Sequence, residues 1–443
     1  MSKPVRVRVR MYQVGFGDCF LVSVEYDKPF ADGRKARHLL IDFGTTGPPR
    51  PSRPPRAPGT TAEVAELIKE HTGGELDALV VTHRHKDHLS GFGDAASAAI
   101  MATLKPRLVL RPWTENPTLP STADSPSGAG LAETEPSDGP PGTASARYAR
   151  LLAAAQGHVH ALARAKALGA QVQEEAEEQL PNADAVRLLD ELAGEHGGRY
   201  LFAGADAGLE DAIPGLTATV LGPPTVEQDA GVGKQKSRDP QYWMLRLGAA
   251  IEGVAKAEAE APTTRPMPLG PGPVRWLVTR LAKQRSHSAA RLVRDLDDAL
   301  NNTSLILLLK VGGLSMLFPG DAQIENWRCT LAQLETDSAL KHDLTCIDLY
   351  KVGHHGSRNA TPRSLHALWE ARPDDLPKMT SLMSTRPGKH GTTEATAVPR
   401  STLVAALEKV STVYSTDDLG PAPFLELEAD ARRGPFRQPF KVE

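Results

Sequence analysis

The segment 82–88, Thr-His-Arg-His-Lys-Asp-His, constrains this chain more than any other feature. It follows the apolar run 78–81, which has the length of a short buried strand. Zinc and similar ions take imidazole nitrogen and carboxylate oxygen, and four side chains here offer them: His83, His85, Asp87 and His88. A loop leaving a strand can turn the first two toward one ion and the last two toward a neighbouring ion. We therefore expect a metal centre; the alternative is a solvated polar loop.

Two later segments place further metal-capable side chains after apolar runs. The run 314–318 leads through Pro319 and Gly320 to Asp321, a carboxylate that could bridge two ions, although Gly-Asp alone usually marks a turn. The run 346–352 leads into Gly-His-His-Gly-Ser at 353–357. Because neighbouring side chains diverge, we expect only one of His354 and His355 to bind metal. The other would contact substrate or donate a proton.

The hydrophobic pattern predicts strands in the first quarter and the last third of the chain. Alternation over 5–13 is typical of a half-buried strand. Thr60 and Glu63 form a capping-box pattern that begins a helix ended by Gly73. Further strands are expected at 20–24, 38–42, 217–221, 304–311, 314–318, 346–352, 381–384 and 410–415. Pro-, Gly- and Ser-rich residues at 114–144 and a helical stretch at 145–193 separate the two groups.

This order predicts one α/β domain whose middle is expanded. We expect the first half of the fold at 1–112, a flexible loop plus helical insertion at 113–198, and strands of the fold at 199–224. A second insertion at 225–298 and the second half of the fold at 299–443 complete the chain.

Composition excludes several other classes of protein. The three cysteines show no CxxC spacing, which argues against a disulfide framework or a cysteine zinc module and fits a reducing cytoplasm. No apolar run reaches the roughly 18 residues of a membrane span, so no membrane role is expected. The 51 Lys and Arg residues against 54 Asp and Glu residues mean that nucleic-acid binding would need a local basic patch.

The three metal-capable segments, in this order, resemble the metallo-β-lactamase superfamily. The resemblance is closest to the soluble metallohydrolase domain of competence proteins of the ComEC/Rec2 type. It is carried by Val-Gly-Phe-Gly-Asp-Cys at 14–19, Leu-Ile-Asp-Phe-Gly at 40–44, Val-Leu-Gly-Pro-Pro at 220–224, Asn-Asn-Thr-Ser-Leu at 301–305 and Ser-Thr-Asp at 415–417. It implies an αββα sandwich with the metal site at one edge of the sheets, and two Zn²⁺ ions, or Mn²⁺.

The resemblance also implies a role for each site residue. His83 and His85 would hold the first ion; Asp87, His88 and one of His354 and His355 would hold the second, with Asp321 bridging. Asp87 could also help to orient the attacking water. Asp42 would orient a ligand histidine, Asp18 would support the site, and His390 would protonate the leaving group. The family's usual third histidine has no clear counterpart here, because His158, His160, His196 and His287 lack motif context. The first position is therefore expected to be incomplete or completed by water.

Three functions are compatible with these observations. The leading hypothesis, from the resemblance, is hydrolysis of a phosphodiester in nucleic acid or a nucleotide by a metal-bound hydroxide. A basic cluster could contact phosphates: Arg280, Lys283, Arg285, Arg291 and Arg294. The membrane channel of the competence proteins is absent, so DNA uptake is not implied. The alternatives are hydrolysis of a small lactone or amide, and an effector or binding subunit of a bacterial defence-type system that docks a protein partner through its helical insertion. An open basic groove would favour nucleic acid; a narrow apolar pocket would favour a small molecule.

Overall fold

The computed structural model describes residues 2–47, 60–116, 182–225, 228, 300–357, 361–386, 388–389 and 397–439. The chain divides into two compact units. Unit 1 comprises Met1–Thr118, Asn182–Thr225 and Asn301–Glu443; unit 2 comprises Leu119–Pro181 and Val226–Leu300. Nearly all described residues belong to unit 1, and the fold below is that of unit 1. The basic cluster at 280–294 lies outside the described residues.

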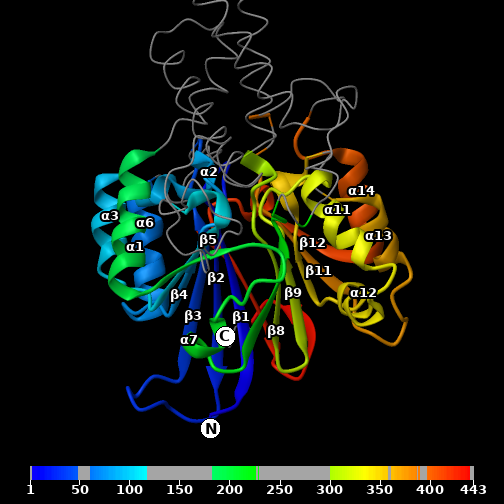
Figure 1. The fold of residues 1–443 in the computed structure, drawn as a ribbon, viewed down its shortest axis with the longest axis horizontal. Coiled ribbons are helices and arrows are strands. Elements are labelled where there is room, and N and C mark those ends of the chain that lie inside the picture. The colour runs from blue at the N-terminus through cyan, green and yellow to red at the C-terminus, as the bar shows by residue number, and fades with distance from the viewer. Residues whose placement is uncertain are drawn as a thin grey trace, which may run out of the picture. The chain divides into compact units, whose positions relative to one another are not determined.

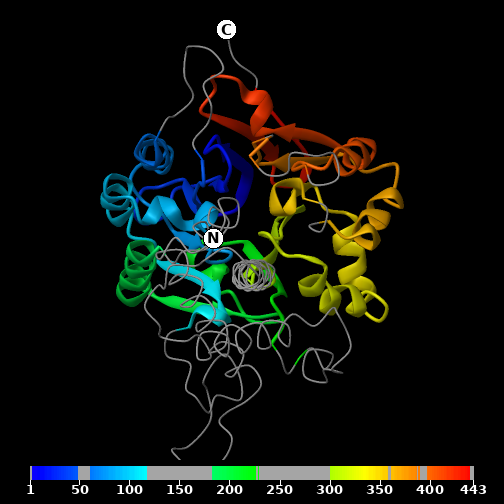
Figure 2. The same cartoon turned by 90° about the horizontal axis from the view of Figure 1, so that it is seen from above.

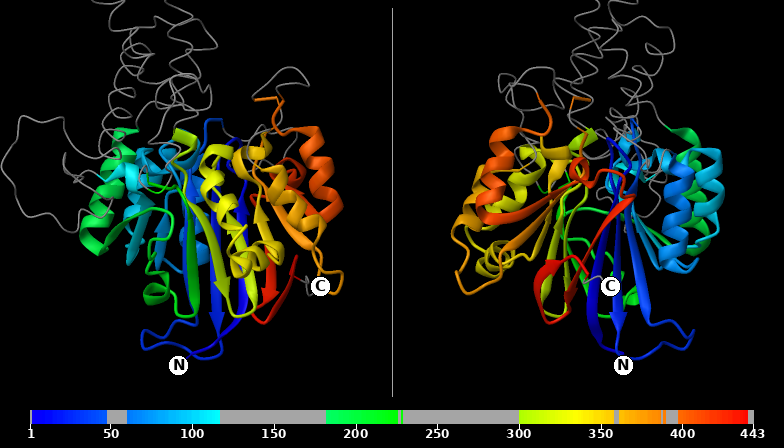
Figure 3. Two further views of the ribbon diagram at one scale, coloured as in Figure 1. Left: turned by 45° about the vertical axis from the view of Figure 1, so that its right-hand side comes forward. Right: turned by 180° about the vertical axis from the view of Figure 1, so that it is seen from behind.

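Unit 1 contains a mixed eight-stranded sheet, which we call the first sheet. Its strands follow the order β14 (Arg433–Arg437), β13 (Phe424–Asp430), β1 (Pro4–Tyr12), β2 (Cys19–Tyr26), β3 (Ala36–Phe43), β4 (Ala78–Val80), β5 (Leu108–Pro112) and β6 (Gly198–Leu201). The strands from β3 to β6 are parallel, and the others pair antiparallel. Figure 3 shows the C-terminal strands, in red, beside the blue N-terminal strand with which β13 pairs.

The second sheet is also mixed and has six strands. Its order is β12 (Ser411–Ser415), β11 (Met379–Met383), β10 (Leu349–Lys351), β9 (Leu314–Phe318), β8 (Ile306–Val311) and β7 (Leu216–Gly222). The strands from β9 to β12 are parallel, whereas β7 pairs antiparallel with β8 and β8 with β9. Gly312 and Gly313 connect β8 and β9, which pair antiparallel.

The two sheets face one another, and helices cover their outer faces (Figures 1 and 2). A buried core between the sheets includes Val9 and Phe20 of the first and Leu307 of the second. The first sheet's outer face packs on α1 (Thr61–Thr72), α3 (Ala95–Ala102) and α6 (Ala183–His196). The second sheet's outer face packs on α11 (Ile324–Gln333), α12 (Ser338–Thr345), α13 (Arg363–Glu370) and α14 (Ser401–Val410). Within the described residues, no helix is long and apolar enough to cross a membrane.

The structure confirms the predicted burial pattern of β1 and the predicted ends of α1. In β1, Val7, Val9 and Met11 are fully buried between the sheets, as the alternation predicts. Helix α1 begins with the Thr60–Glu63 capping box and ends at Gly73 with a φ of 62°. Helix α6 begins within the stretch that sequence patterning placed in the helical insertion, yet it belongs to unit 1. It packs there because Leu189 and Leu192 join the core beneath the first sheet.

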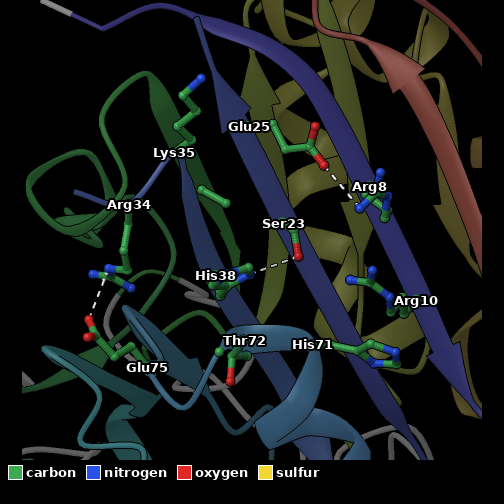
Figure 4. Close-up of a pocket in the computed structure, with 12 residues that line it drawn as sticks. Arg8, Arg10, Ser23, Glu25, Arg34, Lys35, His38, His71, Thr72 and Glu75 are labelled. Carbon is green, nitrogen blue, oxygen red and sulfur yellow. Dashed lines mark hydrogen bonds and ion pairs between the residues drawn. The ribbon is translucent and has the colours of Figure 1, made fainter. Parts of the chain in front are cut away.

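Beyond the end of α1, the outer face of the first sheet is polar and forms a cleft of about 370 Å³ (Figure 4). Its guanidinium groups face carboxylates: Arg8 lies 3.0 Å from Glu25, and Arg34 lies 2.9 Å from Glu75. His38 lies behind them, with Nδ1 2.9 Å from the Ser23 hydroxyl. Burial, together with nearby arginines, lowers the pKa of His38 from 6.5 to about 3. The histidine is therefore neutral in the folded protein at pH values where an exposed histidine would take a proton.

We expect His38 to make the protein less stable in acid. The unfolded chain binds a proton at this residue below about pH 6.5 and the folded chain does not, so the free energy of unfolding falls as the pH drops toward 3. Urea unfolding at pH 7 and pH 4.5 measures how much the free energy of unfolding falls between the two pH values. This fall should be smaller by roughly 1–2 kcal/mol in His38→Gln than in the wild type. The exposed His342→Gln variant is the control, and equal pH slopes in wild type and His38→Gln would contradict the prediction.

Candidate metal centre

The candidate ligands stand where parallel strands of the two sheets end. The segment 82–88 follows β4 and continues into the short helix α2 (Lys86–Leu89), which carries Asp87 and His88. Asp321 follows β9, and His355 lies in η3 (Gly353–Gly356), just after β10. Because parallel strands run in one direction, their carboxyl ends collect at one edge of a sheet. Residues 268 positions apart, Asp87 and His355, thereby come into contact.

Four predicted ligands converge on one point: Asp87, His88, Asp321 and His355. One nitrogen or oxygen of each lies within 4.8 Å of the corresponding atoms of the others. Nε2 of His355 is 2.9 Å from Asp87 Oδ2 and 3.5 Å from Asp321 Oδ2. Nε2 of His88 is 3.2 Å from Asp321 Oδ2. The two histidines are fully buried, so these polar atoms are shielded from water.

The hydrogen bonds behind the two histidines determine which ring nitrogen faces the others. Nδ1 of His355 lies 2.9 Å from the carbonyl oxygen of Ser384, which only accepts, so Nδ1 carries the proton. Nδ1 of His88 lies 2.8 Å from Oδ2 of Asp42 and donates to it. In the neutral form, both Nε2 atoms then present lone pairs toward carboxylate oxygens. The nitrogen lone pairs and the carboxylate oxygens repel one another unless protons or a cation lie between them. Two nitrogens and two oxygens are a ligand set that zinc accepts.

The electrostatics of the cluster favour positive charge at its centre. Burial alone would lower the pKa of His88, but the carboxylates of Asp321, Asp42 and Asp87 raise it well above its usual value. Burial likewise opposes protonation of His355, whereas Asp321 and Asp87 raise its pKa. The carboxyl pKa of Asp321 is held well below normal despite burial, chiefly by His88 and Lys351. The carboxylates thus favour a positive charge on these two histidines, which a bound cation would replace.

The residues predicted for the first ion form a pair beside the four-residue group, with the ring of His83 4.1 Å, centroid to centroid, from that of His88. Nε2 of His83 lies 3.0 Å from Nδ1 of His85, and burial lowers the pKa of both rings, which stay neutral. Among the described residues, the groups of three or more potential ligands contain neither histidine. Of the predicted candidates for a third ligand, His158, His160 and His287 lie outside the described residues, and His196 ends α6.

Of the two adjacent histidines, His355 joins the cluster and His354 does not. The backbone N–H of His354 donates to Asp321 Oδ1 over 3.1 Å, while its ring is only partly buried and lies 6.3 Å, centroid to centroid, from that of His355. Burial lowers the pKa of His354 to about 4, so its ring is neutral at pH 7. His390, the predicted proton donor, lies outside the described residues.

Asp42 and Asp18 lie behind the ligands rather than among them. Asp42 accepts from the backbone N–H and the hydroxyl of Thr82, both over 2.7 Å, as well as from His88. Asp18 lies 3.8 Å from His88 Nδ1, so these two aspartates and His88 form a second group that could hold a metal ion. However, the carboxylate of Asp18 contacts the ammonium of Lys351, and His88 Nδ1 is engaged with Asp42. The carboxylates of Asp18 and Asp42 are therefore already paired with an ammonium group and hydrogen-bond donors.

Sequence patterning did not single out three contributors: Thr82, Ser384 and Lys351. Thr82 and Ser384 carry no signal beyond their position at strand ends. Lys351 does carry one, because a lysine inside the apolar run 346–352 must be buried with a partner. Its side chain is 2% exposed.

The backbone around the centre is strained or tightly packed at several points. Asp42, His354 and His355 have φ values of 57°, 41° and 52°, a left-handed conformation that costs non-glycine residues of order 1–3 kcal/mol each. Gly17 precedes Asp18 with a φ of 154°, and a Cβ there would lie 2.2 Å from the Gly44 carbonyl oxygen. Strain concentrated at a buried polar cluster is typical of a functional site.

No protein-family model matches this chain, and none of the curated proteins is similar to it in sequence. The function is therefore argued from the centre itself and from the motifs that form it.

We expect Asp42→Asn to weaken zinc binding by roughly 10- to 100-fold, because the amide no longer holds His88 with its Nε2 lone pair facing the cluster. Asparagine tolerates the positive φ, so the backbone should be retained. Chelator competition measures the dissociation constant, with the exposed Asp206→Asn as control. Unchanged affinity would show that Asp42 does not orient His88.

Metal binding should release protons and strengthen as the pH rises. His88 and His355 have raised pKa values without metal and must lose a proton to bind it, so acid favours the metal-free form. Calorimetry at pH 7 in buffers of different ionisation enthalpy should detect release of about one to two protons per ion. A dissociation constant that does not change between about pH 6 and 8, with no proton release, would contradict this.

Proposed function

We propose that this chain is a metal-dependent hydrolase with the αββα sandwich of the metallo-β-lactamase superfamily. The layer order of helices, two facing sheets and helices supports the fold. The order of the three metal-capable segments along the chain supports the family. The observation that carries the proposal is the meeting of Asp87, His88, Asp321 and His355 at one point in the interior.

In this proposal the four residues hold a divalent ion, Zn²⁺ or Mn²⁺. The ion would supply Lewis acidity and lower the pKa of a coordinated water. Asp42 keeps the Nε2 lone pair of His88 directed at the centre, and the Ser384 carbonyl does the same for His355. The neutral, partly exposed ring of His354 suits a hydrogen bond to substrate better than protonation of a leaving group. His83 and His85 would complete a second position only with further ligands.

The proposed substrate is a phosphodiester. Support comes from the resemblance to the competence-protein domain, which extends beyond the histidine segment to 14–19, 40–44 and 301–305. Each of these three segments contributes a residue that contacts one of the four proposed ligands. Asp18 and Asp42 lie in the first two, and in the third Ser304 accepts the Asp321 backbone N–H over 3.2 Å.

We expect Asp87→Asn to reduce phosphodiesterase activity by roughly 100- to 1,000-fold, because it removes a charged ligand from the ion and several kcal/mol of transition-state stabilisation. Wild type and variant are loaded with Zn²⁺ or Mn²⁺ and assayed on single-stranded DNA, duplex DNA and an aryl phosphodiester. Asp211→Asn, at an exposed aspartate shortly before β7, is the control.

A wild type that holds metal but cleaves no phosphodiester would contradict the substrate class. Turnover of a lactone or amide by the same preparation would then assign the centre to small molecules. A wild type that holds no metal would contradict the proposed chemistry altogether.

A further inference from the structure

Lys351, the last residue of β10, has its ammonium group buried within the cluster of carboxylates. Its side chain is 2% exposed. Nζ contacts the carboxylate of Asp18, lies 3.3 Å from Asp321 Oδ1 and donates to the Gly320 carbonyl over 3.1 Å. A buried ammonium loses its hydration, so it persists only where opposite charge and hydrogen bonds compensate for that loss. Here both kinds of partner are present.

The two oxygens of the Asp321 carboxylate have different partners. Oδ1 receives the Lys351 ammonium and the His354 backbone N–H. Oδ2 faces Nε2 of His88 and of His355. With Oδ1 occupied, Oδ2 is the oxygen that remains to meet a metal ion. The ammonium therefore lies on the far side of a carboxylate that the ion would share.

Asp18 faces the same two histidines from behind. Its carboxylate oxygens lie 3.6 Å from Nδ1 of His355 and 3.8 Å from Nδ1 of His88. Its backbone N–H also donates to the Asp87 carbonyl over 2.9 Å. Lys351 and Asp18 thus form a buried ion pair. Its charged atoms lie within 4 Å of three of the four proposed ligands, namely His88, Asp321 and His355. Any unbalanced charge on the pair would act on the ion through a medium that screens poorly.

We propose that Lys351 is a resident cation of the metal centre: it neutralises Asp18, occupies one oxygen of Asp321, and by its charge sets how tightly the centre binds a divalent ion. This inference rests on the proposed metal-binding function. The pair is neutral, so it adds no net charge to the field at the ion. Removing Asp18 alone leaves an ammonium that repels the ion; removing Lys351 alone leaves a carboxylate that attracts it.

A double-mutant cycle tests the inference through metal affinity. Zn²⁺ dissociation constants are measured by chelator competition on the metal-free full-length chain for wild type, Asp18→Asn, Lys351→Met and the double variant. We expect Asp18→Asn to bind Zn²⁺ at least tenfold more weakly, Lys351→Met at least tenfold more tightly, and the double variant within about threefold of wild type. Lys351→Arg, which keeps the charge, should remain near wild type.

The control is Lys310→Met, which removes a lysine paired with Asp343 away from the centre and should leave the affinity unchanged. A purely structural role for the pair predicts a different pattern, in which both single variants and the double variant all lose affinity. That pattern, or no change in any variant, would overturn the inference.

Circular dichroism shows whether Lys351→Met folds. If it does not, the inference is tested by comparing the Zn²⁺ affinity of Asp18→Asn with that of the double variant. Recovery of affinity when the lysine is also removed supports the inference, and continued weakness overturns it. Because the readout is metal affinity, a failure to cleave phosphodiesters would contradict the proposed substrate and leave this result standing.

Discussion

The contact of Asp321 Oδ2 with the Nε2 atoms of His88 and His355 is the interaction on which the rest of the centre depends. His88 belongs to the first sheet's half of the fold, while Asp321 and His355 follow strands of the second sheet. Lone pairs from both sheets therefore meet in a buried space that water cannot screen. Such a meeting is stable only with a cation or protons between the atoms, and the raised pKa values of the two histidines express that requirement.

Four buried aspartates surround this point, and they have three different tasks. Asp87 and Asp321 present oxygens to the histidine nitrogens. Asp42 receives the proton of His88 and ties it to Thr82 at the end of β4. Asp18 pairs with Lys351 across the two sheets. Uncompensated carboxylates in the interior would cost several kcal/mol each, so the positive partners and donors are as necessary to the centre as its ligands.

Sequence patterning predicted much of the scaffold because many of its strands and helices are specified by residues within the element itself. The alternation in β1, the capping box of α1 and the apolar run of β4 each specify an element without reference to the rest of the chain. It predicted neither β13 nor β14. Their pairing beside β1 joins residues more than 400 positions apart, and no short-range pattern records a partner at that distance.

The sequence by itself determined the candidate ligands, because histidine and aspartate at strand ends have few other uses in such density. Only the tertiary structure decided their grouping. It placed His355 rather than His354 beside Asp87, with the two rings 6.3 Å apart, centroid to centroid. It also assigned Lys351 to Asp18, a contact between chain segments that no spacing rule connects. Ligand type is a property of the residue, whereas ligand geometry arises from which strand ends the sheets bring to one edge.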